Sequence, residues 1–243
     1  MPCRALFLLV TLAAFLGLAP LSFADDHSGS YRYDAKMAFL KAGELRLNLE
    51  REGESYQVEG QFKTSRALSP YYTWNGVFAA VGRWSPFGGP VTTAYMSQTT
   101  GKDHDLKIVL TYPDATRVLE GAEDEFESID RPGGIDLISA LFFSPSCYQG
   151  GLVHDGEDSY TLSLNSERNH GFNGGRKYFK GEVTSCDYRV IDHKQRQRRV
   201  IVSMAELGGT KVAVQVRAKI PLLPDAVFRL RMPELGNQPA SAR

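Results

Sequence analysis

The sequence has few of the residues from which metal centres and catalytic sites are built. It contains three cysteines and five histidines in 243 residues. No H-E-x-x-H, H-x-H or C-x-x-C spacing brings these residues together, so we expect no metal and no other cofactor. A G-x-S-x-G turn, a glycine-rich phosphate loop and a dinucleotide fingerprint are also missing from the sequence. These gaps disfavour the common hydrolases and nucleotide-dependent enzymes.

The sequence also lacks an excess of charge of either sign. Lysine and arginine number 28 and so do aspartate and glutamate, which gives a formal net charge of zero. There is therefore no overall electrostatic case for a nucleic-acid partner. Beyond the N-terminus no apolar run approaches the roughly 20 residues of a membrane-spanning helix, so we do not expect an integral membrane protein.

Residues 1–24 have the pattern of a cleavable secretory signal. Arg4 precedes an apolar run from Ala5 to Leu18, and a small-x-small site ends at Ala24. The run is short for a membrane span, and no cysteine follows it to accept a lipid. We expect export with cleavage after Ala24, and the alternative is a retained anchor.

Cys147 and Cys186 are the two cysteines that remain after removal of the signal. In an exported chain, a single pair without metal-type spacing indicates a disulfide, here closing a loop of about 40 residues. The alternative is a pair of buried free thiols.

Most of the remaining chain shows alternation with a period of two residues, which is typical of β-strands. The runs 31–39, 45–49 and 56–62 predict an antiparallel meander, with Tyr31, Tyr33, Met37 and Phe39 on one face and a turn at 41–43. Residues 74–82, 91–100, 105–112 and several later runs raise the expected total to about ten strands. One short helix is expected at 136–143, capped by Asp136, ended by Pro145 and buried.

These observations predict a mainly β fold. We expect residues 25–232 to form a single domain, a strongly curved antiparallel sheet in the form of a half-barrel or open barrel, with one short buried helix. Residues 233–243 are expected to form a disordered tail.

The segment 67–90 is rich in aromatic residues. The candidate lining of an apolar ligand pocket consists of Tyr71, Tyr72, Trp74, Phe78, Trp84 and Phe87. The alternative interpretation is ordinary core packing under a loop.

Two polar stretches are weaker candidates. His154, Asp155 and Glu157 form a compact H-D-G-E group of acid–base type, but an Asp-Gly pair is also what a tight turn requires. The basic run 194–199 is either a solvated hairpin or a surface for an anionic partner. We therefore expect no catalytic residues and no enzymatic activity.

Several segments together resemble the bacterial domain of unknown function 3108 family. They are D-L-I-S-A-L at 136–141, Cys147, H-D-G-E-D-S-Y at 154–160, and Gly181, Cys186 and Tyr188. The resemblance covers roughly residues 31–232. It implies a β-rich periplasmic protein of the Gram-negative envelope and brings no catalytic residues with it.

The sequence leaves two main hypotheses for function. The first is a non-enzymatic periplasmic protein that binds or carries an apolar, lipid-like ligand. The second is a structural or assembly factor of the cell envelope that acts through contacts with a protein partner. A hydrolase is the least favoured class.

Overall fold

The computed structural model describes residues 27–69, 75–85, 89–100, 105–111, 115–120, 126–127, 134–156, 158–219 and 224–233. The predicted signal at 1–24 and the tail from residue 234 lie outside these residues. Among the described segments, no helix has the length and apolar character needed to cross a bilayer.

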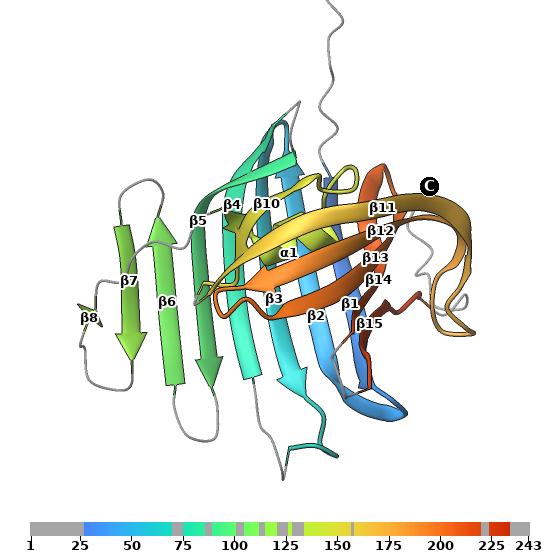
Figure 1. Cartoon of the computed structure of the whole chain (residues 1–243), viewed down its shortest axis with the longest axis horizontal. Helices are drawn as coiled ribbons and strands as arrows, with labels where there is room; N and C mark the ends of the chain where they lie inside the picture. Colours follow the sequence, from blue (N-terminus) through green and yellow to red (C-terminus); the bar gives the residue numbers. More distant parts are fainter. Residues whose placement is uncertain are drawn as a thin grey trace, which may run out of the picture.

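Most of the described chain forms β-strands that join into one sheet (Figure 1). The strands are β1 (His27–Met37), β2 (Leu40–Glu52), β3 (Ser55–Thr64), β4 (Asn75–Ser85), β5 (Gly89–Thr100), β6 (Asp105–Thr111), β7 (Ala115–Glu120), β8 (Phe126–Glu127), β9 (Ile135–Asp136), β10 (Gly150–His154), β11 (Ser159–Asn173), β12 (Lys180–Asp192), β13 (Gln197–Leu207), β14 (Thr210–Lys219) and β15 (Ala226–Leu230). Helix α1 (Leu137–Phe142) lies between β9 and β10 in the chain.

The sheet consists of two meanders that meet at β1. The strand order is β8-β7-β6-β5-β4-β3-β2-β1-β15-β14-β13-β12-β11-β10-β9. From β1 the chain winds outward to β8, and from β9 at the opposite edge it winds back to β15, which pairs with β1. Neighbouring strands are antiparallel except for the short β9–β10 pair.

The sheet curls strongly but does not close into a barrel. Its two edge strands, β8 and β9, do not pair with each other. Register shifts, which bend and twist strands, occur after Ala35, Val81, Leu164 and Ser203. Figure 1 shows β11 to β14 crossing over β1 to β4 with α1 between them.

The predicted half-barrel or open barrel of antiparallel strands is thus confirmed. The described sheet has fifteen strands instead of about ten. Part of the excess consists of β8 and β9, which are two residues long and too short to show alternation in the sequence.

Strands β1, β2 and β3 form the predicted meander, but its first turn differs from the expectation. The turn lies at residues 38–39 instead of 41–43, and Ala38 adopts a φ of 52°. Phe39, expected to face the core, is 90% exposed. The register shift after Ala35 interrupts the alternation, and the earlier turn places Phe39 at the hairpin tip.

Helix α1 is the predicted buried helix. The Asp136 side chain caps it by accepting a hydrogen bond from the Ser139 backbone N–H at 2.8 Å, and the helix ends before Pro145. The helix contacts β5 in the first meander and β10, β13 and β14 in the second. It therefore occupies the inside of the curl.

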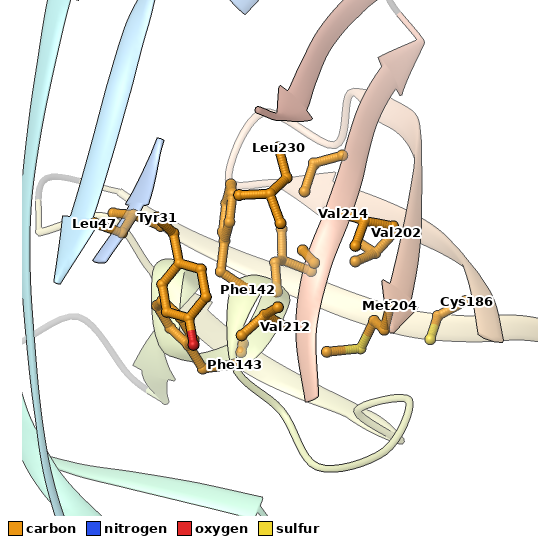
Figure 2. Close-up of a cluster of buried hydrophobic side chains, with 14 of the residues drawn as sticks. Tyr31, Leu47, Phe142, Phe143, Cys186, Val202, Met204, Val212, Val214 and Leu230 are labelled. Atoms are coloured by element: carbon orange, nitrogen blue, oxygen red, sulfur yellow. The ribbon is translucent and has the colours of Figure 1, made fainter. Parts of the chain in front are cut away.

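Two phenylalanines at the end of α1 connect the two meanders. The Phe142 ring meets Tyr33 edge-on at a centroid distance of 5.3 Å, and Phe143 lies 5.7 Å from Tyr31. Figure 2 shows both rings between Tyr31 and Leu47 on one side and the second meander on the other. The buried residues on that other side include Val202, Met204, Val212 and Val214. Each such apolar side chain stabilises the fold by about 1.5–3 kcal/mol.

A buried polar contact fastens the edge strand β9 to the inner face of β5. The Thr92 hydroxyl donates to Asp136 Oδ2 at 2.6 Å, and the Asp136 backbone N–H donates to the same hydroxyl at 3.1 Å. Tyr56 of β3 lies 3.3 Å from that hydroxyl. All three side chains are buried. This group brings the far edge of the second meander onto the first meander.

Cys147 and Cys186 form the predicted disulfide, and both are buried. The bond joins the segment after α1 to β12, with 39 positions between the two residues. It therefore ties the helix-bearing connection to the second meander.

The long β11–β12 hairpin folds back over the outer face of β1 and β15. At its turn, the Tyr178 hydroxyl donates to Asp34 Oδ2 at 3.0 Å. Arg231 donates to the other carboxylate oxygen at 2.6 Å, and the Lys41 ammonium lies 3.4 Å from it. This Asp34 clamp holds the end of the hairpin against the centre of the sheet.

Replacing Cys147 with serine is expected to destabilise the protein by about 4 kcal/mol, because the unfolded chain regains the freedom of a loop of about 40 residues. The melting temperature measured by calorimetry should fall by about 10 °C. Reductant should lower the melting temperature of the wild-type protein and leave the variant unchanged. Equal melting of both proteins would contradict the disulfide.

The Asp34 clamp predicts a dependence of stability on pH. Burial raises the pKa of Asp34, but the hydrogen bonds from Arg231 and Tyr178 and the charges of Arg231 and Lys41 outweigh it, so the pKa lies below its usual value. The clamp therefore stabilises the fold above the ordinary aspartate pKa of about 3.9 and loses this effect as pH falls through the lowered pKa.

We expect Asp34→Asn to lower the free energy of unfolding at pH 7 by about 1.5–3 kcal/mol, since charged hydrogen bonds are lost. Urea unfolding should show this difference at pH 7 and a shrinking difference below about pH 4. A difference that stays constant down to pH 2 would show that the Asp34 charge is not the source of the stabilisation.

Candidate functional site

The aromatic residues predicted to line a pocket fall into two groups. Tyr71, Tyr72, Trp74 and Phe87 lie outside the described residues. Phe78 and Trp84 both lie on β4, six positions apart and so separated by about 20 Å along the strand. The structure does not bring these two into one site.

Trp84 belongs to the packed core. Its side chain is 8% exposed, its ring centroid lies 5.4 Å from that of Tyr56, and the Arg51 guanidinium stands 5.5 Å from its centroid. The surroundings of Trp84 are those expected for ordinary core packing, the alternative to a pocket lining. Arg51 covers the indole face on the solvent side as a cation–π partner.

Phe78 lies on the concave face of the sheet and is partly exposed. Its ring covers Gly60, its partner on β3, so closely that a Cβ at Gly60 would stand 1.9 Å from the ring. Glycine at position 60 thus makes room for the phenylalanine. Phe78 also packs against Ala80, Tyr95 and Ile108, a second small apolar cluster on this part of the sheet.

We use the name concave phenylalanine cluster for Phe62, Phe78, Phe142 and Phe228, which all belong to the main core or pack against it. Phe62 lies two positions from Gly60 on β3, and its ring centroid is 6.3 Å from that of Phe228 on β15. Phe228 in turn lies 6.5 Å from Phe142 of α1. Phe142 is buried, whereas the other three keep part of their surface exposed.

The concave phenylalanine cluster is the best candidate for an apolar binding surface among the described residues. It joins β3, β4, β15 and α1 at a place where the core is only partly covered. It offers apolar contact and ring faces, without acid–base chemistry from its own side chains. Phe78 could be predicted from the aromatic segment 67–90, but Phe228 could not, because local sequence patterns do not show that β15 lies next to β1.

The H-D-G-E stretch does not form an open acid–base site. His154 is fully buried, and its ring stands perpendicular to Tyr95 at a centroid distance of 5.2 Å. Its ring is therefore shielded from any substrate in solvent. Glu157 lies outside the described residues.

Asp155 has a structural role in the turn. Its carboxylate accepts the Asp158 backbone N–H at 2.9 Å and the Tyr160 hydroxyl at 2.6 Å. Gly156 has a φ of +103°, a conformation that glycine adopts readily. The turn interpretation of the Asp-Gly pair is confirmed.

The basic run 194–199 forms the exposed hairpin between β12 and β13. Asp192 accepts the backbone N–H groups of Lys194 and Arg196 at 2.9 Å each, and Arg196 Nε donates to its second oxygen at 2.6 Å. Arg199 forms a two-pronged pair with Asp187 on β12. Several of these charges are therefore neutralised within the hairpin.

No group of three or more His, Cys, Asp or Glu side chains suited to a metal ion occurs in the described segments.

Comparison with known proteins gives one structural likeness. No family model matches the chain, and no curated protein matches its sequence. The crystal structure of a β-barrel-like protein of domain of unknown function 1849 from Brucella abortus aligns with a TM-score of 0.46 and 10% identity, covering 84% of this chain and 95% of that chain. Because no family model matches, membership of the 3108 family stays a prediction.

Proposed function

We propose that this chain is a non-enzymatic periplasmic protein that binds or carries an apolar, lipid-like ligand at the concave phenylalanine cluster. The observation that carries the proposal is the partial exposure of Phe62, Phe78 and Phe228, which pack against the buried core on the concave face of the sheet. Ring faces of this kind suit an acyl chain, which gains by leaving water.

Other features support a binding role over catalysis. His154 is buried, and Asp155 is engaged in the turn that follows it. The exposed His193 lies 3.0 Å from the carboxylate of Asp158, to which it is paired. Residues 1–24 read as an export signal, and the likeness to the 3108 family suggests the periplasm. Export to that compartment also suits the disulfide between Cys147 and Cys186.

An assembly role through the sheet edges has weaker support. The edge strands β8 and β9 are each two residues long. They offer little backbone of their own, and each pairs with only two positions of its neighbour, β7 or β10, in the described residues. The ligand-binding proposal is preferred because the concave phenylalanine cluster supplies a defined apolar surface.

The test is to express the full chain with its own N-terminus in a Gram-negative host and to examine the purified protein by native mass spectrometry. We expect a bound lipid, released into organic solvent, and displacement of a fluorescent fatty acid probe by that lipid. Phe78→Ala and Phe228→Ala should each weaken probe binding by about tenfold, the expected cost of a lost aromatic contact.

Phe39→Ala is the matched control, because it removes an exposed phenylalanine far from the cluster in the sequence and at a hairpin tip. It should leave probe binding unchanged. Absence of lipid and of probe binding, or equal weakening in all three variants, would contradict the proposal.

A further inference from the structure

The outer face of the second meander carries a row of polar side chains that the concave cluster does not use. Cys186, Val202 and Val214 belong to the core, so the alternate residues on β12, β13 and β14 face away from α1. Cross-strand register aligns Arg168, Ser185, Ser203 and Gln215 in one row. Ser203 and Gln215 are only 3% and 6% exposed, which is unusual for polar residues on an outer face.

These side chains lie at the floor and walls of a groove of about 530 Å³. Its walls come from β11, β12, β13 and β14, and its lining includes Arg168, His170, Ser185, Ser203, Gln215 and Arg217. The Asp34 clamp holds the far end of the β11–β12 hairpin in place. A volume of this size lies within the range of small-molecule sites.

Hydroxyl and imidazole groups form a hydrogen-bonded row along the groove. His170 Nε2 lies 2.9 Å from the Ser185 hydroxyl, which lies 2.9 Å from the Ser203 hydroxyl. Gln215 accepts from Arg229 Nε at 2.9 Å, so its amide oxygen is oriented. Such a row can exchange hydrogen bonds with the hydroxyl groups of a polar ligand.

The charges of the groove favour an anion. Its carboxylates are Glu167 and Asp187, and Asp187 is already neutralised by Arg199. Glu167 is then the remaining acidic residue of the lining, and the two arginines Arg168 and Arg217 exceed it by one positive charge.

Arg217 has an unused donor at the groove. Its Nε is buried and makes no hydrogen bond within the described residues, although the side chain as a whole keeps 37% exposure. The carboxylate of Asp225 approaches the guanidinium only to 4.0 Å. Because the side chain keeps part of its surface exposed, the guanidinium can still donate to an anionic oxygen in the groove through its accessible N–H groups.

We propose that this groove binds a phosphate ester with a hydroxyl-bearing body, of the size of a sugar phosphate or glycerol phosphate. The phosphate oxygens accept from Arg217, and the body lies along Ser203 and Ser185 toward Arg168. Arg168 and Arg217 stand three strands apart, about 14 Å at ordinary strand spacing, so a bare phosphate cannot reach both. The proposal is independent of the apolar ligand above.

Calorimetric titration of the full chain with sn-glycerol 3-phosphate tests the proposal, with glycerol as the uncharged control. We expect binding of the phosphate ester that weakens as salt is added, and none of glycerol. Arg217→Gln should weaken it about tenfold or more, because a charge-assisted contact is lost. Arg66→Gln, which alters an exposed arginine in the turn after β3, should bind as the wild type does.

Lipid vesicles distinguish two possible sources of the phosphate ester, a lipid headgroup and a soluble metabolite. Co-sedimentation with phosphatidylglycerol vesicles but not phosphatidylcholine vesicles, lost in Arg217→Gln, assigns the site to a lipid headgroup. Titration by the soluble ester alone assigns it to a free metabolite. The proposal is overturned if wild-type protein binds neither probe, or if Arg66→Gln weakens binding as much as Arg217→Gln in proteins of equal melting temperature.

Discussion

The contact between Asp136 and Thr92 is the constraint on which the curled shape depends. Asp136 belongs to an edge strand, yet its carboxylate accepts a hydrogen bond from β5 of the other meander and also caps α1. A buried carboxylate is stable only when donors surround it, so this group fixes strand, helix and sheet relative to one another. A second polar contact supports it, because the Tyr95 hydroxyl of β5 donates to the Asp155 carbonyl oxygen of the second meander at 2.7 Å.

Apolar packing around α1 also holds the two meanders together, in addition to the Asp136–Thr92 contact. Phe142 and Phe143 of the α1 region reach Tyr33 and Tyr31 of β1. The disulfide ties the segment that follows the helix to β12. The helix thus fills the interior of an unclosed sheet, and three rings of the concave phenylalanine cluster stay partly exposed there.

The two faces of the second meander have different chemistry because strand side chains alternate. Inward residues such as Val202 complete the core, while outward residues such as Ser203 line a polar groove under the β11–β12 hairpin. The Asp34 clamp keeps that hairpin folded over the sheet. One curled sheet therefore presents an apolar surface inside and a cationic, hydroxyl-rich groove outside.

Local patterns in the sequence were enough to predict the strands of the first meander, the capped helix at Asp136 and the pairing of Cys147 with Cys186. The strands and the helix depend on neighbouring residues. The disulfide could be predicted because only two cysteines remain after the signal. The neighbours β1 and β15, the Asp136–Thr92 contact and the groove depend on which distant segments meet, and periodicity carries no such information. Phe39 was misplaced for a local reason, since a single register shift reverses the faces that follow it.

The most direct test of the central contact is hydrogen–deuterium exchange of Thr92→Val, which removes the hydroxyl while keeping the branched shape. We expect the free energy of unfolding to fall by about 1–3 kcal/mol, since Asp136 Oδ2 is left without this donor. Amide exchange should become faster both in β5 and in the segment from β9 through α1, which are distant in the sequence. Faster exchange confined to β5, or no change in either segment, would contradict the claim that this contact holds the two halves of the sheet together.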